Sequence, residues 1–572
     1  MRPLPTSRAL RRCPSPCIAK ISHKPSFVSI NPYIQCCNAP PTVFITKYFS
    51  TTSRYEKRKN RQLYQEEQIN NADSSLQDHR AIGTKQSLFL THPSSPGAPF
   101  FQPAGTRIFQ KLIAFLRGQY PYFGFREVLT PMIYKDSLWK QSGHWDNYKD
   151  DMFAVVGNSL QTLEQEISSS KIDRVQPAGV LNEAEELEKY GLKPMNCPGH
   201  CLLFRSQRRS YRDLPIRYAE FSPLHRNEIS GALSGLTRVR RFHQDDGHIF
   251  CRPSQVAKEI DKSLAFIRMV YETLNLNDYR LVLSTRPATG YIGTIDEWDR
   301  AEHQLKMALD NNFNTEWDIK AGEGAFYGPK IDIILRDGQG KEHQTGTIQL
   351  DFQLPKRFDL TYESPSPELE AKGEDWKGTD PGAILGKVVP VMVHRAVLGS
   401  LERFMALLLE QHKSQLPFWL SPNQMAILTV SDKEHIVAYA RTVKEEILGH
   451  RSKRLPRRLE AANYEIHIDD SAESIARKIV QAKKTRYNII GVVGNRNVTG
   501  ADSGTGHTID LDVSAQPDQL KTWSLIEQVK PGSRAPRKRD RGVGSSFRGL
   551  PGVRLDLSQC RDLIRLLSET YA

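Results

Sequence analysis

The chain lacks acidic residues at its start. Neither aspartate nor glutamate occurs before Glu56 in this sequence of 572 residues. The same stretch is rich in Ser and Thr, has no compact apolar segment of the kind found in secretory signals, and contains the basic residues Arg2, Arg8, Arg11, Arg12, Lys20, Lys24, Lys47 and Arg54. This composition is typical of an organelle transit peptide, which we predict over residues 1–50. Residues 51–77 are predicted to be a linker. A disordered basic tail is the alternative.

Long apolar runs and cysteine are also scarce. No run approaches the roughly 18 residues that a membrane-spanning helix needs. Four of the eight cysteines lie in the first 50 residues, which leaves Cys197, Cys201, Cys251 and Cys560 in the rest of the chain. So few cysteines exclude a disulfide scaffold and indicate a reducing compartment.

Both common glycine-rich phosphate-binding motifs are missing. The sequence contains no Gly-x-x-x-x-Gly-Lys-Ser/Thr loop and no Gly-x-Gly-x-x-Gly that opens a helix. Any nucleotide chemistry would therefore depend on other groups, such as arginine side chains. The net charge of +14 favours a polyanionic partner without specifying which one.

Periodicity predicts a few elements in the first two thirds of the chain. Residues 106–118 have the apolar spacing of a helix, and residues 125–129 are predicted to be a strand. Further strands are predicted over 331–335 and 347–352. Residues 156–190 are rich in Ser, Glu and Gln and are predicted to be an insertion, and the polar 363–380 segment is predicted to be a surface loop.

A domain boundary is predicted near residue 416. Beyond it, strands alternate with helices, which indicates a small α/β domain with a mixed sheet over 416–572. Residues 531–550 are basic and rich in Gly and Pro, so we predict a disordered insertion there. The strands are predicted over 425–430, 464–468 and 487–493, and the helices over 435–448, 474–484 and 558–569.

Four motifs occur in a distinctive order. They are Lys193-Pro-Met-Asn-Cys-Pro-Gly-His200, His225-Arg-Asn-Glu228, Arg238-Val-Arg-Arg-Phe-His-Gln-Asp-Asp-Gly-His248 and Val393-His-Arg-Ala-Val-Leu-Gly-Ser-Leu-Glu-Arg403. Together they resemble those of the threonyl-tRNA synthetases, a family of class II aminoacyl-tRNA synthetases, and the similarity runs from about Asp78 to the C-terminus. The resemblance implies an α+β fold with a class II antiparallel-sheet catalytic domain at 78–415 and a C-terminal α/β anticodon-binding domain at 416–572.

The resemblance also implies an activity and its partners. An enzyme of this family activates L-threonine with ATP and Mg²⁺ to threonyl-adenylate, and then transfers the threonyl group to the 3′ end of tRNA(Thr). With the transit peptide, the expected location is the mitochondrial matrix. In this family motif 1, here residues 125–131, forms part of a two-fold interface, so we expect a homodimer.

The family uses arginines for the phosphate chemistry. A guanidinium group pairs phosphate oxygens through two hydrogen bonds and keeps its charge, so it suits both activation of the α-phosphate and release of pyrophosphate. Arg226 resembles the residue that binds the α-phosphate, Arg238 the one that meets the γ-phosphate, and Arg403 the arginine of motif 3. The other expected ATP-binding positions are Glu228 near the adenine amino group, Phe242 stacked on adenine, and Gln349.

The resemblance further implies a zinc site. Cys197, His248 and His394 match the metal ligands of the family, and three protein ligands leave one position open for substrate. Ligation of the hydroxyl would reject valine, which has the same shape as threonine. The three residues are 51 and 146 positions apart, so spacing alone does not reveal the site. A rival local site would combine Cys197 and His248 with Cys201 and Cys251.

Further residues are expected around the amino acid. Asp246 resembles the carboxylate that accepts the threonine hydroxyl, Gln244 lies on the same face of its strand, and Tyr327 resembles the tyrosine near the substrate amino group. His144 resembles the histidine that moves a proton during transfer to tRNA. A structural role for His144 is the alternative.

Some features depart from the family pattern. Ser471 and Ala472 stand where the family often carries an Arg-Asn pair, so anticodon recognition is expected to be weaker or redistributed. The basic run 534–541 contacts tRNA or is a solvated linker. No large editing domain is expected before the catalytic region, so serine should be misactivated. A prolyl-type class II synthetase and a catalytically inactive tRNA-binding paralogue are the alternative functions.

Overall fold

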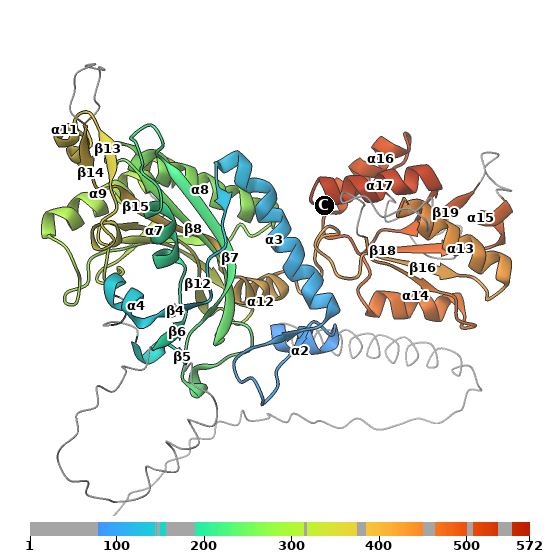
Figure 1. The fold of residues 1–572 in the computed structure, drawn as a ribbon. Helices are drawn as coiled ribbons and strands as arrows, with labels where there is room; N and C mark the ends of the chain where they lie inside the picture. The colour runs from blue at the N-terminus through green and yellow to red at the C-terminus, as the bar shows by residue number, and fades with distance from the viewer. Residues whose placement is uncertain are drawn as a thin grey trace, which may run out of the picture. The chain divides into compact units, whose positions relative to one another are not determined.

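The structure is a computed structural model that describes residues 78–143, 145, 149–155, 189–313, 317–374, 385–449, 464–499, 507–535 and 552–572 (Figure 1). The predicted transit peptide and linker lie outside these residues, as do His144, nearly all of the predicted 156–190 insertion, and residues 536–551. Within the described part, no helix has the length and apolar character needed to cross a membrane.

The larger sheet has eight strands in the order β10-β9-β11-β12-β15-β8-β7-β3. The five central pairings, from β9 through β7, are antiparallel, and the outer strands β10 and β3 pair in parallel with their neighbours. The expected antiparallel sheet is therefore confirmed. The strands are β3 Arg126–Glu127, β7 Ile216–His225, β8 Arg241–Cys251, β9 Arg280–Ser284, β10 Trp317–Lys320, β11 Lys330–Arg336, β12 Glu342–Asp351 and β15 Val391–Ser400.

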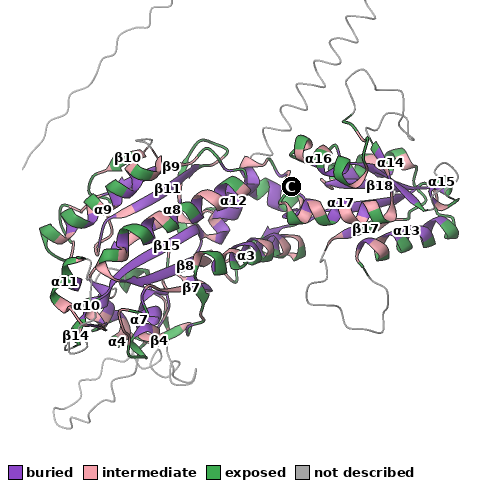
Figure 2. Cartoon of the chain, turned by 90° about the horizontal axis from the view of Figure 1, so that it is seen from above, coloured by how far each residue is buried: buried purple, intermediate pink, exposed green. Residues whose placement is uncertain are grey.

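Alternation along the strands divides this sheet into two faces. Ile348 and Leu350 of β12 join the main apolar core, whereas Gln349 between them points to the opposite side. The core face packs against helices α3 Pro103–Phe123, α8 Val256–Thr273, α9 Ile295–Phe313 and α12 Leu401–Gln411, and Figure 2 shows the central strands as buried. The other face remains for the functional groups.

Helix α3 confirms and extends the predicted 106–118 helix. Pro103 occupies its first turn, where the missing N–H costs no hydrogen bond, and Gly124 ends it with a left-handed φ of 77°. The predicted 125–129 strand shrinks to β3, Arg126–Glu127, which pairs with β7, and one further backbone hydrogen bond of 2.8 Å runs from Val128 to Ala219 of β7.

The predicted 363–380 surface loop is wrong in its first half. This segment begins within β13 Tyr362–Ser364, which pairs with β14 Gly386–Val388, and continues into α11 Pro367–Lys372. The cause is a buried charge: Glu370 is 1% exposed and its Oε2 accepts a hydrogen bond of 2.7 Å from Arg252 Nη2. The distant Arg252 partner allows a polar helix to pack against the protein.

The second sheet is mixed, as predicted, in the order β17-β16-β18-β19-β20. β16 pairs in parallel with β17 and β18, and the other pairings are antiparallel. Its elements are β16 Met425–Thr429, α13 Glu434–Ile447, β17 Ile466–Asp469, α14 Ile475–Lys484, β18 Ile489–Val493, α15 Asn495–Thr499, β19 Thr508–Asp512, α16 Gln519–Val529, β20 Gly552–Asp556 and α17 Leu557–Glu569. The predicted strands and helices here match within one or two residues, while no ranges were predicted for α15, β19, α16 and β20. The domain boundary near residue 416 stays a prediction.

Smaller elements surround the larger sheet. They are α2 His79–Lys85, β1 Phe89–Leu90, β2 Phe100–Phe101, β4 Ile133–Lys135, α4 Asp136–Ser142, β5 Ala154–Val155, β6 Tyr190–Leu192, α7 Cys197–Arg205 and α10 Leu354–Arg357.

Candidate active site

A cavity of about 400 Å³ lies over the free face of the larger sheet. Every predicted site residue within the described part of the chain lines it, and His144 lies outside that part. The predicted residues that line it are Cys197, Arg226, Glu228, Arg238, Phe242, Gln244, Asp246, His248, Tyr327, Gln349, His394 and Arg403. Five strands and helices and the loops between them thus converge on one space.

The three predicted metal ligands come together at one end of the cavity. Cys197 begins α7, while His248 on β8 and His394 on β15 are directly opposed in the antiparallel register. One ligand atom from each residue lies within 4.8 Å of the other two, and His248 Nε2 is 3.0 Å from His394 Nδ1. Strand pairing therefore supplies the proximity that the sequence spacing hides.

The hydrogen bonds around the two histidines orient their lone pairs. His394 Nε2 lies 2.9 Å from Asp351 Oδ2. Because a carboxylate only accepts, His394 donates from Nε2 and keeps a lone pair on Nδ1. His248 Nδ1 lies 2.7 Å from His200 Nδ1, so His248 Nε2 is the nitrogen that faces His394. Two lone pairs pointing into one gap fit a shared cation.

Electrostatics favour the same arrangement. Burial and the neighbouring His394 and His200 lower the pKa of His248, so its imidazole is neutral, as a metal ligand must be. Burial and the Asp246 carboxylate raise the pKa of the Cys197 thiol, so a thiolate here needs a cation beside it.

A buried charge network supports His200 from behind. His200 Nε2 donates to Glu220 Oε2 at 3.0 Å, and Lys193 Nζ donates to Glu220 Oε1 at 2.9 Å. Burial acts to raise the pKa of Glu220, but the hydrogen bonds from His200 and Lys193 outweigh it and lower the pKa to about 2. With Glu220 charged, His200 holds its proton on Nε2 and accepts at Nδ1 from His248.

The rival cysteine site is not assembled among the described residues. Cys201 contacts Met392 Sδ within an apolar cluster. Cys251 is three residues beyond His248 on β8, so its side chain points to the opposite face and joins the main core.

Positive charge gathers at the other end of the cavity. The Arg226 guanidinium lies over the Phe242 ring at 5.1 Å, and its Nε is buried without a hydrogen-bond partner in the described part of the protein. Arg238 Nη2 pairs with Glu228 Oε2 at 2.7 Å. Burial, together with the charges of Arg226 and Arg238, lowers the pKa of Arg403. Several guanidinium groups in one cavity suit a polyanion such as a triphosphate.

The remaining predicted residues lie between these ends. Asp246 is buried, accepts a hydrogen bond of 3.1 Å from Asn196 Nδ2, and approaches His248 Nε2 to 3.7 Å. Burial raises the pKa of Asp246. The Tyr327 ring stacks on His394 at 5.2 Å and its hydroxyl donates to Gln349 Oε1.

Gln349 therefore lies beside the predicted metal ligands. On β12 it is directly opposite His394 of β15. Gln349 was predicted to bind the nucleotide. Its position opposite His394 instead favours contact with the amino acid.

Several cavity residues were not predicted. Among them, Lys330, Gln344 and Thr347 line the cavity, while Asp351 and His200 orient the histidines. A signal existed for two of these. Asp351 follows Gln349 by two positions on one strand, and His200 follows Cys197 by one turn of the same helix.

Comparisons with known proteins agree with the geometry. Residues 181–371 match the tRNA synthetase class II core domain (G, H, P, S and T), and residues 424–505 match the Anticodon binding domain family. The chain is 43% identical over 465 residues to the probable mitochondrial threonine–tRNA ligase of Schizosaccharomyces pombe, covering 80% of this chain and 90% of that protein. It is also 43% identical over 461 residues to the human mitochondrial threonine–tRNA ligase, covering 80% of this chain and 56% of the human protein.

A solved structure gives the same match. The crystal structure titled as the RNA binding domain of threonyl-tRNA synthetase from Cryptosporidium parvum superimposes with a TM-score of 0.65 at 38% identity. The match covers 86% of this chain and 98% of that one.

Proposed function

Because this chain belongs to the threonine–tRNA ligase family, we propose that its cavity joins L-threonine to ATP as threonyl-adenylate and then passes the threonyl group to the 3′ end of tRNA(Thr). The observation that carries this proposal is the Cys197, His248 and His394 cluster in the same cavity as the arginines. Proline offers no hydroxyl for such a cluster to test, and an inactive paralogue would have no use for the arginines.

We propose Zn²⁺ as the metal of the cluster. One thiol and two imidazoles whose nitrogens lie 3.0 Å apart are a donor set that zinc prefers. A metal held by Cys197, His248 and His394 would act as a Lewis acid that ligates the amino and hydroxyl groups of threonine.

Asp246 is proposed to accept the threonine hydroxyl. Its carboxylate lies 3.7 Å from His248 Nε2, next to the place where that hydroxyl would be held. Valine has no hydroxyl to donate there and would leave Asp246 Oδ1 buried without a donor, while Asp246 Oδ2 keeps its hydrogen bond from Asn196. The Tyr327 ring and Gln349 lie beside His394, and we propose that they face the amino group of threonine.

Adenylate formation needs charge around phosphorus. A threonine carboxylate oxygen attacks the α-phosphorus, and the bond to the pyrophosphate oxygen breaks. We propose that Arg226 and Arg403 stabilise the negative charge that develops on the phosphate oxygens. Arg238 would exchange its ion pair with Glu228 for the γ-phosphate, which frees Glu228 for the adenine amino group and leaves the Phe242 ring to stack on the base. Mg²⁺ accompanies ATP in class II synthetases.

Transfer follows when a terminal ribose hydroxyl of tRNA attacks the threonyl carbonyl carbon and AMP leaves. His144 is proposed to move the proton of that hydroxyl. The anticodon-binding region is proposed to recognise tRNA(Thr) without the family's Arg-Asn pair. Ser471 and Ala472 are exposed, and Ser471 Oγ donates to Asp469 Oδ1 at 2.7 Å.

We also propose a homodimer in the mitochondrial matrix. Large apolar side chains around motif 1 are unusually exposed, at 85% for Tyr122, 82% for Leu129 and 45% for Ile133. A second copy would cover them. The acid-free, basic start of the chain and its mitochondrial relatives support the location.

ATP–pyrophosphate exchange with each of the standard amino acids tests the activity. We expect strong exchange with threonine, weaker exchange with serine, which lacks only a methyl group, and none with valine or proline. Arg226→Lys, which keeps the charge but loses the two-pronged geometry, should lower exchange by roughly 100-fold or more. Exchange that depends on proline would overturn the proposal, and so would the absence of exchange with every amino acid tested.

A further inference from the structure

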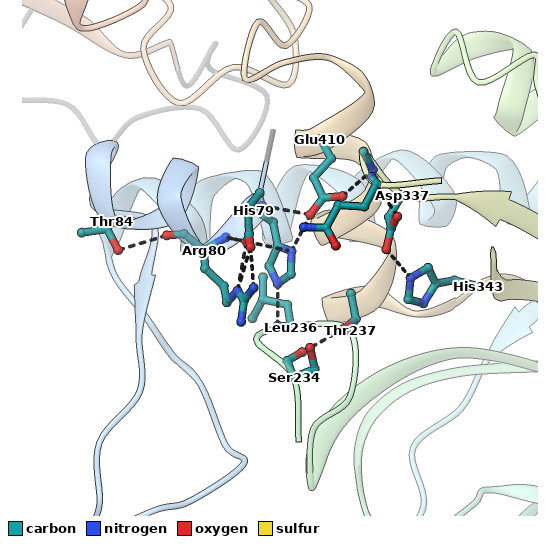
Figure 3. A network of polar contacts seen from close by, with 12 residues as sticks. His79, Arg80, Thr84, Ser234, Leu236, Thr237, Asp337, His343 and Glu410 are labelled. Atoms are coloured by element: carbon teal, nitrogen blue, oxygen red, sulfur yellow. Dashed lines mark hydrogen bonds and ion pairs between the residues drawn. The ribbon is translucent and has the colours of Figure 1, made fainter. Parts of the chain in front are cut away.

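His79 uses both of its ring nitrogens in buried hydrogen bonds (Figure 3). It is the first residue of α2 and is 4% exposed. Its Nδ1 lies 2.7 Å from Glu410 Oε1, and its backbone N–H donates to the same oxygen at 2.9 Å. On the other side, its Nε2 lies 3.1 Å from the backbone nitrogen of Leu236.

These partners determine the tautomer of the ring. The Leu236 N–H can only donate, so His79 Nε2 accepts. The Glu410 carboxylate accepts, so His79 Nδ1 carries the proton. His79 therefore connects the Glu410 carboxylate to the Leu236 backbone amide. Its Nδ1 donates a hydrogen bond and its Nε2 accepts one.

Leu236 belongs to the loop 226–240, which connects β7 to β8 and carries Arg238 into the active-site cavity. The tip of this loop is a tight turn, in which Ser234 and Arg238 exchange backbone hydrogen bonds of 3.1 and 3.2 Å. Fixing Leu236 thus fixes the backbone two residues before Arg238.

Gly235 permits the contact. Its φ is +46°, and a Cβ added there would come within 2.2 Å of His79 Nε2. Only glycine lets the loop approach the imidazole this closely. The loop sequence and His79 are therefore matched to one another.

Helix α12 holds the loop at two neighbouring residues. Arg403 Nε donates to the carbonyl oxygen of Thr237 at 2.9 Å, and Glu410 reaches Leu236 through His79. Arg403 and Glu410 are seven residues apart, which is about two turns, so both project from one side of the helix. Glu410 Oε2 also accepts from the Gly338 N–H at 2.8 Å, in the turn between β11 and β12.

We infer that His79 is a positioning residue for adenylate formation: it holds the 226–240 loop where Arg238 can meet the nucleotide. It touches none of the predicted substrate-binding residues directly and acts through the Leu236 amide. This inference rests on the proposed function, since it assigns the loop to ATP.

Two substitutions test the hydrogen bonds of His79 Nδ1 and His79 Nε2 separately. In His79→Asn the amide nitrogen can stand near the Nδ1 position and still donate to Glu410, but nothing accepts from Leu236. In His79→Gln the longer side chain brings an oxygen near the Nε2 position, where it accepts from Leu236. Arg80→Gln is the control. Arg80 is the residue after His79 on α2, is exposed, and forms an ion pair with Asp78, the N-cap of that helix.

We expect His79→Asn to raise the KM for ATP by roughly tenfold in threonine-dependent pyrophosphate exchange, because a buried amide loses its partner. The KM for threonine and the zinc content should stay unchanged. Hydrogen–deuterium exchange without substrates should be faster in peptides spanning 230–240. His79→Gln should stay within about threefold of the wild type in all of these measurements, and Arg80→Gln should match the wild type.

Two outcomes would overturn the inference. One is an unaltered KM for ATP and unaltered loop exchange in His79→Asn. The other is equal loss in the Asn and Gln variants, which would indicate only a structural role. If the wild-type protein shows no threonine-dependent exchange, the proposed function fails instead, and the deuterium exchange of the loop still tests whether His79 holds it.

Discussion

At the scale of single residues, Cys197 lies where a free thiolate is disfavoured. Burial and the nearby Asp246 carboxylate raise the pKa of its thiol, so the isolated side chain keeps its proton. A divalent cation between Cys197, His248 and His394 would reverse this, since a bound metal displaces the thiol proton. Metal binding and the ionisation of Cys197 are therefore coupled.

We expect Cys197→Ser to lose bound zinc and threonine-dependent pyrophosphate exchange together, because a hydroxyl is a much poorer zinc ligand than a thiolate. Metal analysis of the purified protein and the exchange assay measure the two losses. Cys201→Ser is the matched control: its thiol is also fully buried but contacts only Met392 and apolar neighbours, so it should keep zinc. Zinc lost in Cys201→Ser as well as in Cys197→Ser would restore the rival site, which uses both thiols as ligands.

The residues of this site were predictable only through a family resemblance. His248 and His394 are 146 positions apart, and this spacing does not predict that β8 and β15 place them opposite one another. Asp351, which orients His394, was missed although it follows Gln349 by two positions on β12 and therefore lies on the same face of that strand. Likewise, the role of Gln349 depends on which strand is its neighbour.

At the scale of elements, Glu220 connects β7 to its surroundings. Besides Lys193 and His200, it accepts from the Thr130 N–H at 3.0 Å, so one carboxylate joins three separate segments. Its pKa is about 2 in the folded protein, against an ordinary value of 4.5. The unfolded chain therefore binds more protons between these values, and the stability that Glu220 contributes is complete above about pH 4.5 and lost as the pH falls toward 2.

We expect Glu220→Gln to be about 3–5 kcal/mol less stable at pH 7, since Lys193 remains buried without its counter-charge. Between pH 4.5 and 3 its stability should fall less steeply than that of the wild type. Urea unfolding at a series of pH values measures both effects. Glu569→Gln, which breaks the exposed pair with Arg565, is the control and should cost at most about 1 kcal/mol. A pH profile for Glu220→Gln parallel to that of the wild type would contradict the assignment.

Helices and strands were predictable where the apolar residues have a regular period and where proline or glycine marks the end of the element. Helix α3 has both, with a leading proline, a closing glycine and aligned apolar residues that include Ile108, Leu112, Ile113 and Leu116. Helix α11 has no apolar stripe, because it packs through the buried Glu370 and its partner Arg252. A prediction from neighbouring residues in the sequence does not include a counter-charge that lies more than a hundred residues away.

At the scale of the whole molecule, the central question is which exposed apolar surface is covered by a second copy. The order of strands and helices predicts the C-terminal α/β domain and the family resemblance implies the class II sheet, but the proposed two-fold contact involves surface residues that no periodicity marks. Leu129 is 82% exposed and lies in motif 1, four residues before the exposed Ile133. Leu520 on α16 is 89% exposed and lies far from motif 1 in the sequence, so the two leucines differ mainly in location.

This difference allows a matched test of the proposed homodimer. A carboxylate at residue 129 would be buried without a partner if the two copies meet there, and the cost of burying an unpaired charge exceeds what the lost apolar contact alone would cost. We therefore expect Leu129→Asp to be a monomer in light scattering at concentrations where the wild-type protein is a dimer, with pyrophosphate exchange reduced in parallel. Leu520→Asp should remain a fully active dimer, because an exposed charge stays hydrated. A wild-type protein that is monomeric at full activity would refute the dimer. A dimer that survives Leu129→Asp would show that the copies meet through another surface.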